Sequence, residues 1–77
     1  MNYTVIKNLR DKLNMSLMAL KVIIRKEYHA EVSETLLNAL ELKRTLKITN
    51  YRKRKAIEAW INDNSHILQR RKHASNI

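Results

Sequence analysis

The fold is decided by residues 5–24, whose sequence is VIKNLRDKLNMSLMALKVII. Six apolar residues recur there at spacings of three and four, which is the pattern of a helix with one apolar face. They are Ile6, Leu9, Leu13, Leu17, Leu20 and Ile24. Asn14 and Ser16 leave two alternatives open, because each can interrupt a helix and Ser16 can cap a new one. Either one helix runs from about Thr4 to Lys26, or two helices bury the same face.

The composition also favours helices over strands. The 77 residues include no Gly and no Pro, which are the residues that form most hairpin turns, whereas helix-favouring Leu, Lys, Ala, Arg and Glu are plentiful. Ser33 is a good N-cap for a helix that reaches about Leu46. Thr49 or Asn50 can cap a further helix from about Tyr51 to Asn62. A last short helix is expected near residues 66–72. The sequence therefore predicts an all-α fold, a small bundle of four or five helices.

A chain of this length forms one domain, which we expect at residues 1–73 with a disordered tail at 74–77. Such a small domain buries only roughly 60% of its unfolded surface, so self-association would add stability. Residues 15–24 are apolar on all sides, which predicts either a central core helix or a homodimer contact. The predicted dimer interface consists of Leu13, Leu17, Met18, Leu20, Val22 and Ile24.

The positive charge is concentrated in the second part of the chain. Residues 1–42 contain six Lys and Arg against five Asp and Glu, whereas residues 43–77 contain ten against two. The net charge of +9 is therefore +1 in the first part and +8 in the second. Seven of the basic residues lie between Lys43 and Lys55, with no acidic residue among them. This asymmetry predicts a near-neutral structural part, 1–42, and a basic part, 43–73, that faces a polyanion such as nucleic acid.

Four of these basic residues stand where stability alone does not favour them. Arg52, Lys53, Arg54 and Lys55 fall in the first turn of an expected helix. Positive charge there opposes the helix dipole by about 0.3–1 kcal/mol for each exposed residue. A bound phosphate reverses the sign of that interaction. The alternative interpretation is a solvated basic face that only keeps the protein soluble.

Residues 42–60 resemble a helix-turn-helix unit, so the expected bundle includes a helix-turn-helix-like unit. The resemblance is carried by Leu42, Leu46, Ile48, Thr49, Ala56, Ile57 and Trp60. Two positions depart from it: Lys47 stands where the turn often has Gly, and Lys53 stands where an inward residue is usual. The resemblance implies that the outer face of the second helix enters the major groove of duplex DNA. The predicted nucleic-acid-binding residues are Lys43, Arg44, Lys47, Thr49, Asn50, Tyr51, Arg52, Arg54, Lys55, Arg70 and Arg71.

The residues give little support to catalysis, cofactor binding or membrane insertion. The chain contains no Cys, so it has no disulfide and no thiolate ligand, and its three His residues lack the spacing of a metal site. No Gly-rich phosphate loop and no nucleophile with an adjacent base are present, so we expect no enzyme, no cofactor and no bound metal. The longest apolar-rich stretch, 15–24, is about half the length that spans a bilayer. We expect a cytoplasmic, nucleoid-associated protein without a membrane partner.

A second resemblance leaves another function open. Residues 56–60, followed by Arg70 and Arg71, are similar to very small enterobacterial virulence regulators, including the negative regulators of AraC-type activators. In those families an aromatic residue, an alanine pair, a tryptophan and a later basic pair recur, whereas their common terminal Cys is absent here. That resemblance implies inhibition by binding a transcription factor, polymerase or nucleoid protein. A small RNA-binding protein is a third alternative. The leading prediction is a dimeric DNA-binding transcription regulator.

Overall fold

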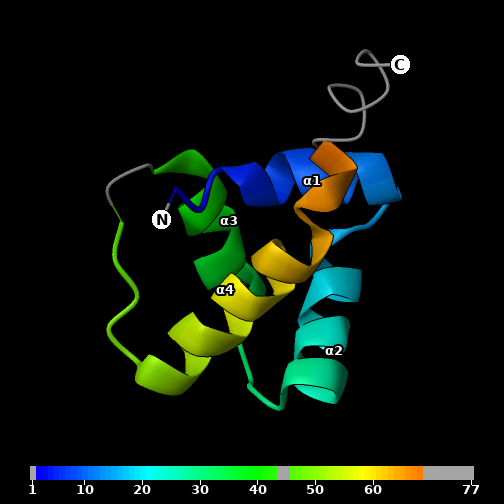
Figure 1. The fold of residues 1–77 in the computed structure, drawn as a ribbon. Coiled ribbons are helices and arrows are strands. Elements are labelled where there is room, and N and C mark those ends of the chain that lie inside the picture. Colours follow the sequence, from blue (N-terminus) through cyan, green and yellow to red (C-terminus); the bar gives the residue numbers. More distant parts are fainter. Residues whose placement is uncertain (1, 44–45, 69–77) are drawn as a thin grey trace, which may run out of the picture.

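The computed structural model describes residues 2–43 and 46–68. This part of the chain forms four helices and contains no strand. The helices are α1 (Val5–Leu13), α2 (Leu17–Tyr28), α3 (Glu34–Leu42) and α4 (Tyr51–Asn64). The chain is helical again at residues 66–68. In Figure 1, α1 lies across the top of a small bundle and α4 rises diagonally towards it from below. The predicted all-α bundle is confirmed.

One hydrophobic core joins all four helices, because α1 and α2 each pack on both α3 and α4. Its fully buried side chains are Ile6, Leu9, Leu20, Ile24, Leu37, Leu40 and Ile57. The inward face predicted for α4 is buried as expected, and Trp60 is only 2 % exposed. The near-neutral and the basic parts of the sequence therefore share a single core.

The apolar face predicted across residues 6–24 is buried only in part. Leu20 and Ile24 are 0 % exposed inside the protomer. The expectation that these two residues line a dimer interface is therefore wrong, because core neighbours already cover their side chains. Leu13 remains 36 % exposed and Leu17 is half-buried, since the chain changes direction between these two residues.

That change of direction is set by three residues between α1 and α2. Asn14 ends α1 in the left-handed conformation, with φ of 54°, which Asn adopts more readily than most residues. The backbone N–H of Met15 donates to the carbonyl of Arg10 at 2.9 Å. Ser16 then caps α2, because its hydroxyl accepts a hydrogen bond from the N–H of Ala19 at 3.1 Å. Of the two alternatives in the sequence, the interrupted helix is confirmed.

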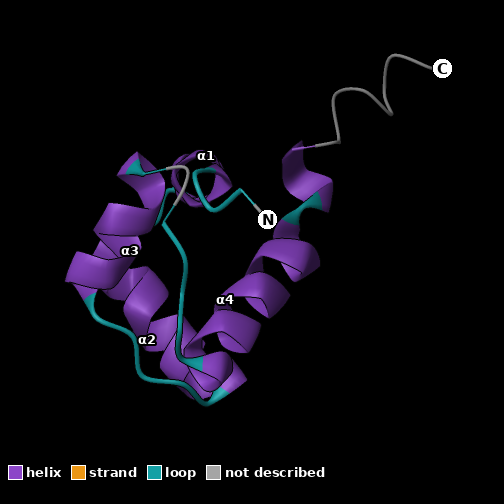
Figure 2. Ribbon diagram, turned by 90° about the vertical axis from the view of Figure 1, so that its left-hand side faces the viewer, coloured by secondary structure: helices purple, strands orange, loops and turns teal. Residues whose placement is uncertain are grey.

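The connection between α3 and α4 is longer than the sequence suggested. Ser33 caps α3 as predicted, but the helix ends at Leu42 instead of about Leu46, and residues 43–50 precede α4. Ile48 is 6 % exposed and lies in the core, whereas Leu42 is 71 % exposed. Ile48 belongs to the segment 46–50, and Figure 2 shows this segment descending to the start of α4. A helix-turn-helix unit normally has a turn of about three or four residues, and these eight residues take its place.

Candidate nucleic-acid interface

The basic run begins at a well-defined helix start. Asn50 has extended backbone angles, and its side-chain oxygen accepts a hydrogen bond from the N–H of Lys53 at 3.0 Å. Its carbonyl accepts from the N–H of Arg54 at 2.9 Å. These two bonds fix the first turn of α4, in which no residue is acidic. Of the two predicted caps, Thr49 and Asn50, it is Asn50 that caps α4, and its side-chain oxygen already accepts the hydrogen bond from Lys53.

Helical periodicity sorts the residues of α4 onto two faces. The inner face consists of Ala56, Ile57, Trp60 and Ile61, all of which are buried. On the outer face Tyr51 is 65 % exposed, and Arg52 and Lys55 are also exposed. Arg54 is half-buried on the flank. The burial of the inner face therefore directs the cationic side chains outward.

Tyr51 gathers two of these cations around its ring. The guanidinium carbon of Arg54 lies 5.5 Å from the ring centroid, and Nζ of Lys55 lies 5.4 Å from it. Both follow Tyr51 by one helical turn, at positions i+3 and i+4. Cation–π contacts at exposed sites contribute about 0.5–1 kcal/mol each, so a stronger anionic ligand can displace them. The start of α4 is thus an aromatic ring flanked by positive charge.

The carboxylates of the described residues do not neutralise this cluster. The ion pairs in residues 2–43 and 46–68 are Lys7 with Asp11, at 3.3 Å, and Arg10 with Glu41, at 2.6 Å. Neither pair includes a residue of 51–55. The two carboxylates of α4 itself each accept a hydrogen bond from a tyrosine hydroxyl: Glu58 from Tyr3 at 2.9 Å and Asp63 from Tyr28 at 2.5 Å.

Both tyrosine contacts raise the pKa of a phenol. Burial and then the hydrogen bond to Asp63 raise the pKa of Tyr28 to about 12. Burial and the hydrogen bond to Glu58 likewise raise the pKa of Tyr3 above its usual value. Each hydroxyl therefore keeps its proton, and donates to its carboxylate, up to a higher pH than an ordinary tyrosine does.

A shallow hollow of about 360 Å³ lies beside the basic cluster. Its lining consists of Tyr28, Tyr51, Arg52, Lys55, Ala56 and Ala59. Tyr28 is the last residue of α2, so the hollow is formed by two helices. Tyr28 is not predictable from the sequence as part of this site, because no local pattern connects it with residues 51–59. Only the packing of α2 on α4 brings them together.

The other predicted contact residues occupy different surroundings. Lys43, Lys47 and Thr49 are exposed in the connection before α4. Lys43 follows the end of α3, which Figures 1 and 2 place beside α1 and away from the start of α4, whereas Thr49 directly precedes the cap of α4. Arg44, Arg70 and Arg71 lie outside the described residues, as does the predicted tail at 74–77.

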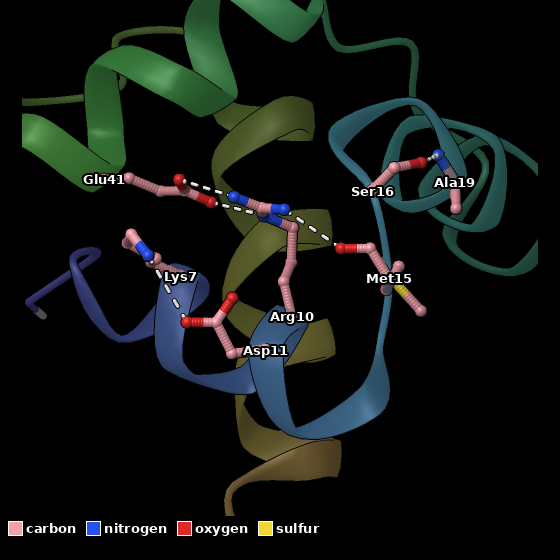
Figure 3. Close-up of polar contacts among 7 residues, drawn as sticks. All are labelled: Lys7, Arg10, Asp11, Met15, Ser16, Ala19 and Glu41. Atoms are coloured by element: carbon pink, nitrogen blue, oxygen red, sulfur yellow. Dashed lines mark hydrogen bonds and ion pairs between the residues drawn. The ribbon is translucent and has the colours of Figure 1, made fainter.

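Arg10 is a basic residue that the structure removes from the cationic surface. Its guanidinium makes a two-point contact with Glu41, at 2.6 Å from Nε and 2.9 Å from Nη2, and Nη1 donates to the carbonyl of Met15 at 2.9 Å (Figure 3). The side chains of Arg10 and Glu41 are only 14 % and 4 % exposed. The hydrogen bonds to Glu41 raise the pKa of Arg10 above its usual value. This contact joins α1, α3 and the turn before α2, and it makes a rigid frame for the bundle.

Three residues of the predicted dimer interface remain at the surface. Met18 is 61 % exposed, and Leu13 and Val22 are each 36 % exposed. A second hollow, of about 320 Å³, lies on this side of α2 and is lined by Met18, Lys21, Val22, Arg25, Glu31 and Val32. The surface therefore combines apolar residues with charges of both signs.

Comparison with protein-family models, with curated proteins and with solved structures finds no match to this chain. Within the described part of the chain, no cluster of three or more His, Asp or Glu is placed to hold a metal ion. No helix in residues 2–43 and 46–68 is long and apolar enough to cross a membrane.

Proposed function

We propose that this protein is a small DNA-binding regulator of transcription that contacts duplex DNA through the first two turns of α4. The observation that carries the proposal is the exposed cationic group of Arg52 and Lys55 beside Tyr51. Among the described residues, none of these side chains is paired with a carboxylate. Occupation of DNA by such a surface is the physical means by which a small binding protein affects transcription.

The charge distribution supports phosphate as the main ligand. Each Lys or Arg that neutralises a phosphate releases counterions from DNA, which supplies most of the affinity of a basic surface. Arg is also suited to the edge of guanine, where it donates two hydrogen bonds to O6 and N7. Arg52 and Lys55 are the residues of α4 with exposed positive charge, so we assign them the principal contacts. Lys43 and Lys47 add phosphate contacts from the preceding connection.

The test is a gel-shift titration at about 50 mM salt with duplex DNA, a structured RNA and a single strand. The double variant Arg52→Ala/Lys55→Ala should bind duplex DNA about tenfold or more weakly than the unchanged protein. The matched control is Lys7→Ala/Lys12→Ala, which removes the same charge from α1, at the opposite end of the bundle from the start of α4 (Figure 1). This control should bind nearly as well as the unchanged protein.

Three results would contradict the proposal. If the unchanged protein binds no duplex DNA, the proposed function is wrong. If both double variants lose duplex binding equally, only the net charge of the protein matters. Stronger binding to the structured RNA than to DNA would move the ligand to RNA and leave the surface assignment intact.

We propose that the active form is a homodimer whose two subunits contact each other through the outer side of α2. Apolar Met18 and Val22 form the centre of this surface, and Arg25 and Glu31 lie in the same hollow. A twofold contact is self-complementary, so a pairing of Arg25 with Glu31 of the partner subunit forms twice.

Sedimentation of the free protein tests the dimer. The unchanged protein should sediment as a dimer, and Met18→Lys should sediment as a monomer because a buried unpaired charge destabilises the contact. Leu42→Lys is the control, because Leu42 is also an exposed apolar residue but lies on α3. A monomer in the unchanged protein, or a dimer in Met18→Lys, would contradict the assignment.

A further inference from the structure

The hollow between the end of α2 and the outer face of α4 has a distinct chemical composition. Tyr28 and Tyr51 supply aromatic rings, Ala56 and Ala59 supply a small apolar base, and Arg52 and Lys55 supply positive charge. No carboxylate belongs to this lining. Such a surface suits a ligand that joins a flat ring to a negatively charged group.

The two tyrosines differ in how firmly they are held. Tyr28 is half-buried against the core, and its hydroxyl donates to Asp63, so its ring is fixed. Tyr51 is 65 % exposed, and Arg54 and Lys55 lie over its ring. The hollow thus has one fixed aromatic side and one that can adjust to a ligand.

The size of the hollow suits a single ring system. Small-molecule sites usually enclose about 300–1,000 Å³, and this hollow, at about 360 Å³, is at the lower end of that range. The bases of intact duplex DNA are stacked on one another and do not offer a free face. Only a nucleotide that has left the stack can place its base here.

We propose that the hollow receives one unstacked nucleotide, with its base against the rings of Tyr28 and Tyr51 and its phosphate beside Arg52 and Lys55. This inference rests on the proposed function, because the same cations bind the neighbouring duplex. The inference adds a class of ligand, namely DNA with an unpaired nucleotide, such as a bulge or a flap. Stacking on aromatic side chains tolerates any base, so the hollow selects an unpaired base and not a particular sequence.

The first arm of the test uses the unchanged protein and needs no variant. Fluorescence anisotropy would measure the Kd for an intact duplex, the same duplex with one bulged nucleotide, and the same duplex with a bulged abasic residue. We expect about tenfold tighter binding to the bulged nucleotide than to the intact duplex, and no such gain for the abasic bulge. The abasic ligand has the same phosphate, so the difference isolates the base.

The second arm fills the hollow without altering charge or aromatic content. Ala59→Leu places a larger side chain at its base, and we expect the preference for the bulge to disappear while duplex binding stays unchanged. Ala19→Leu is the matched control, because Ala19 is a half-buried alanine in the first turn of α2, outside the hollow. It should keep the tenfold preference. Circular dichroism of both variants would verify that they are folded.

The outcomes separate this inference from the proposed function. If the protein binds duplex DNA but gains nothing from the bulged base, or gains equally from the abasic bulge, the inference is overturned and the proposed function stands. A preference that persists in folded Ala59→Leu also overturns it. If none of the three ligands is bound, the proposed function fails, and the inference fails with it.

Discussion

Arg10 shows how a single residue can support a distant surface. Its guanidinium satisfies both oxygens of Glu41 and one carbonyl of the α1–α2 turn, although Arg10 and Glu41 are 31 positions apart in sequence. Removal of one member of a buried ion pair leaves the other charge without a counterion, which is more unfavourable than the loss of both. The placement of α1, α3 and the α1–α2 turn relative to one another therefore depends on this pair.

Arg10→Met should lower the free energy of unfolding by about 2–4 kcal/mol, because it leaves the nearly buried carboxylate of Glu41 unpaired. Urea unfolding followed by circular dichroism would measure the change. Lys7→Met is the control: it breaks the exposed pair with Asp11 and should change stability by less than about 1 kcal/mol. An Arg10→Met protein as stable as the control would show that the pair is not structural.

Tyr28 links stability to alkaline pH. Its pKa in the folded protein is about 12, above the usual value of 10.0, so its contribution to stability is complete below pH 10 and is lost as the pH rises towards 12. Unfolding at pH 8 and pH 11 should therefore show a smaller difference between the unchanged protein and Tyr28→Phe at the higher pH. Tyr51→Phe, at an exposed tyrosine, is the control for general alkaline effects. A difference that stays constant with pH would contradict the role of the bond to Asp63.

At the scale of the helix, the start of α4 depends on one cap. Asn50→Ala removes the acceptor for the N–H of Lys53 and should lower the free energy of unfolding by about 1 kcal/mol. Thr49→Ala is the control, because Thr49 is exposed and Asn50 is the residue that caps the helix. Thermal unfolding would compare the two. A greater loss in the Thr49 variant would mean that the helix begins one residue earlier.

The helix starts are more predictable from the sequence than the helix ends. Ser16, Ser33 and Asn50 cap helices through bonds to a residue three positions later, so the signal is local. The end of α3 is not local: the helix stops at Leu42 because Ile48 must reach a core formed by the other helices. The pattern of apolar residues at 42–46 is compatible with helix, and only tertiary packing ends it there.

The candidate site divides in the same way. The exposure of Tyr51, Arg52 and Lys55 was predictable, because the apolar positions of α4 define the opposite face. Two other contributions were not predictable, because they come from segments more than twenty residues away. They are Tyr28 in the hollow and the contact of Tyr3 with Glu58. Residue type and spacing predict which side chains of one helix are exposed. The fold decides which side chains from other segments lie beside them.

At the scale of the whole molecule, the charge is arranged in two regions. The first part of the chain, with a net charge of +1, contains both described ion pairs, and the second part, with +8, contains the cationic start of α4. Figures 1 and 2 place α1 and the start of α4 at opposite ends of the bundle. The exposed cations of α4 therefore lie at the end of the bundle away from the ion-paired residues of α1, which favours a polyanion at that end.

The most direct test of this account is the salt dependence of DNA binding. Fluorescence anisotropy between about 50 and 200 mM salt gives the slope of log K against log salt concentration, which changes by about 0.9 for each phosphate contact on duplex DNA. The account predicts that Arg52→Ala/Lys55→Ala flattens the slope by roughly 1.8, whereas Lys7→Ala/Lys12→Ala leaves it unchanged. Equal slopes for the Arg52→Ala/Lys55→Ala protein and the unchanged protein would show that DNA does not contact the start of α4.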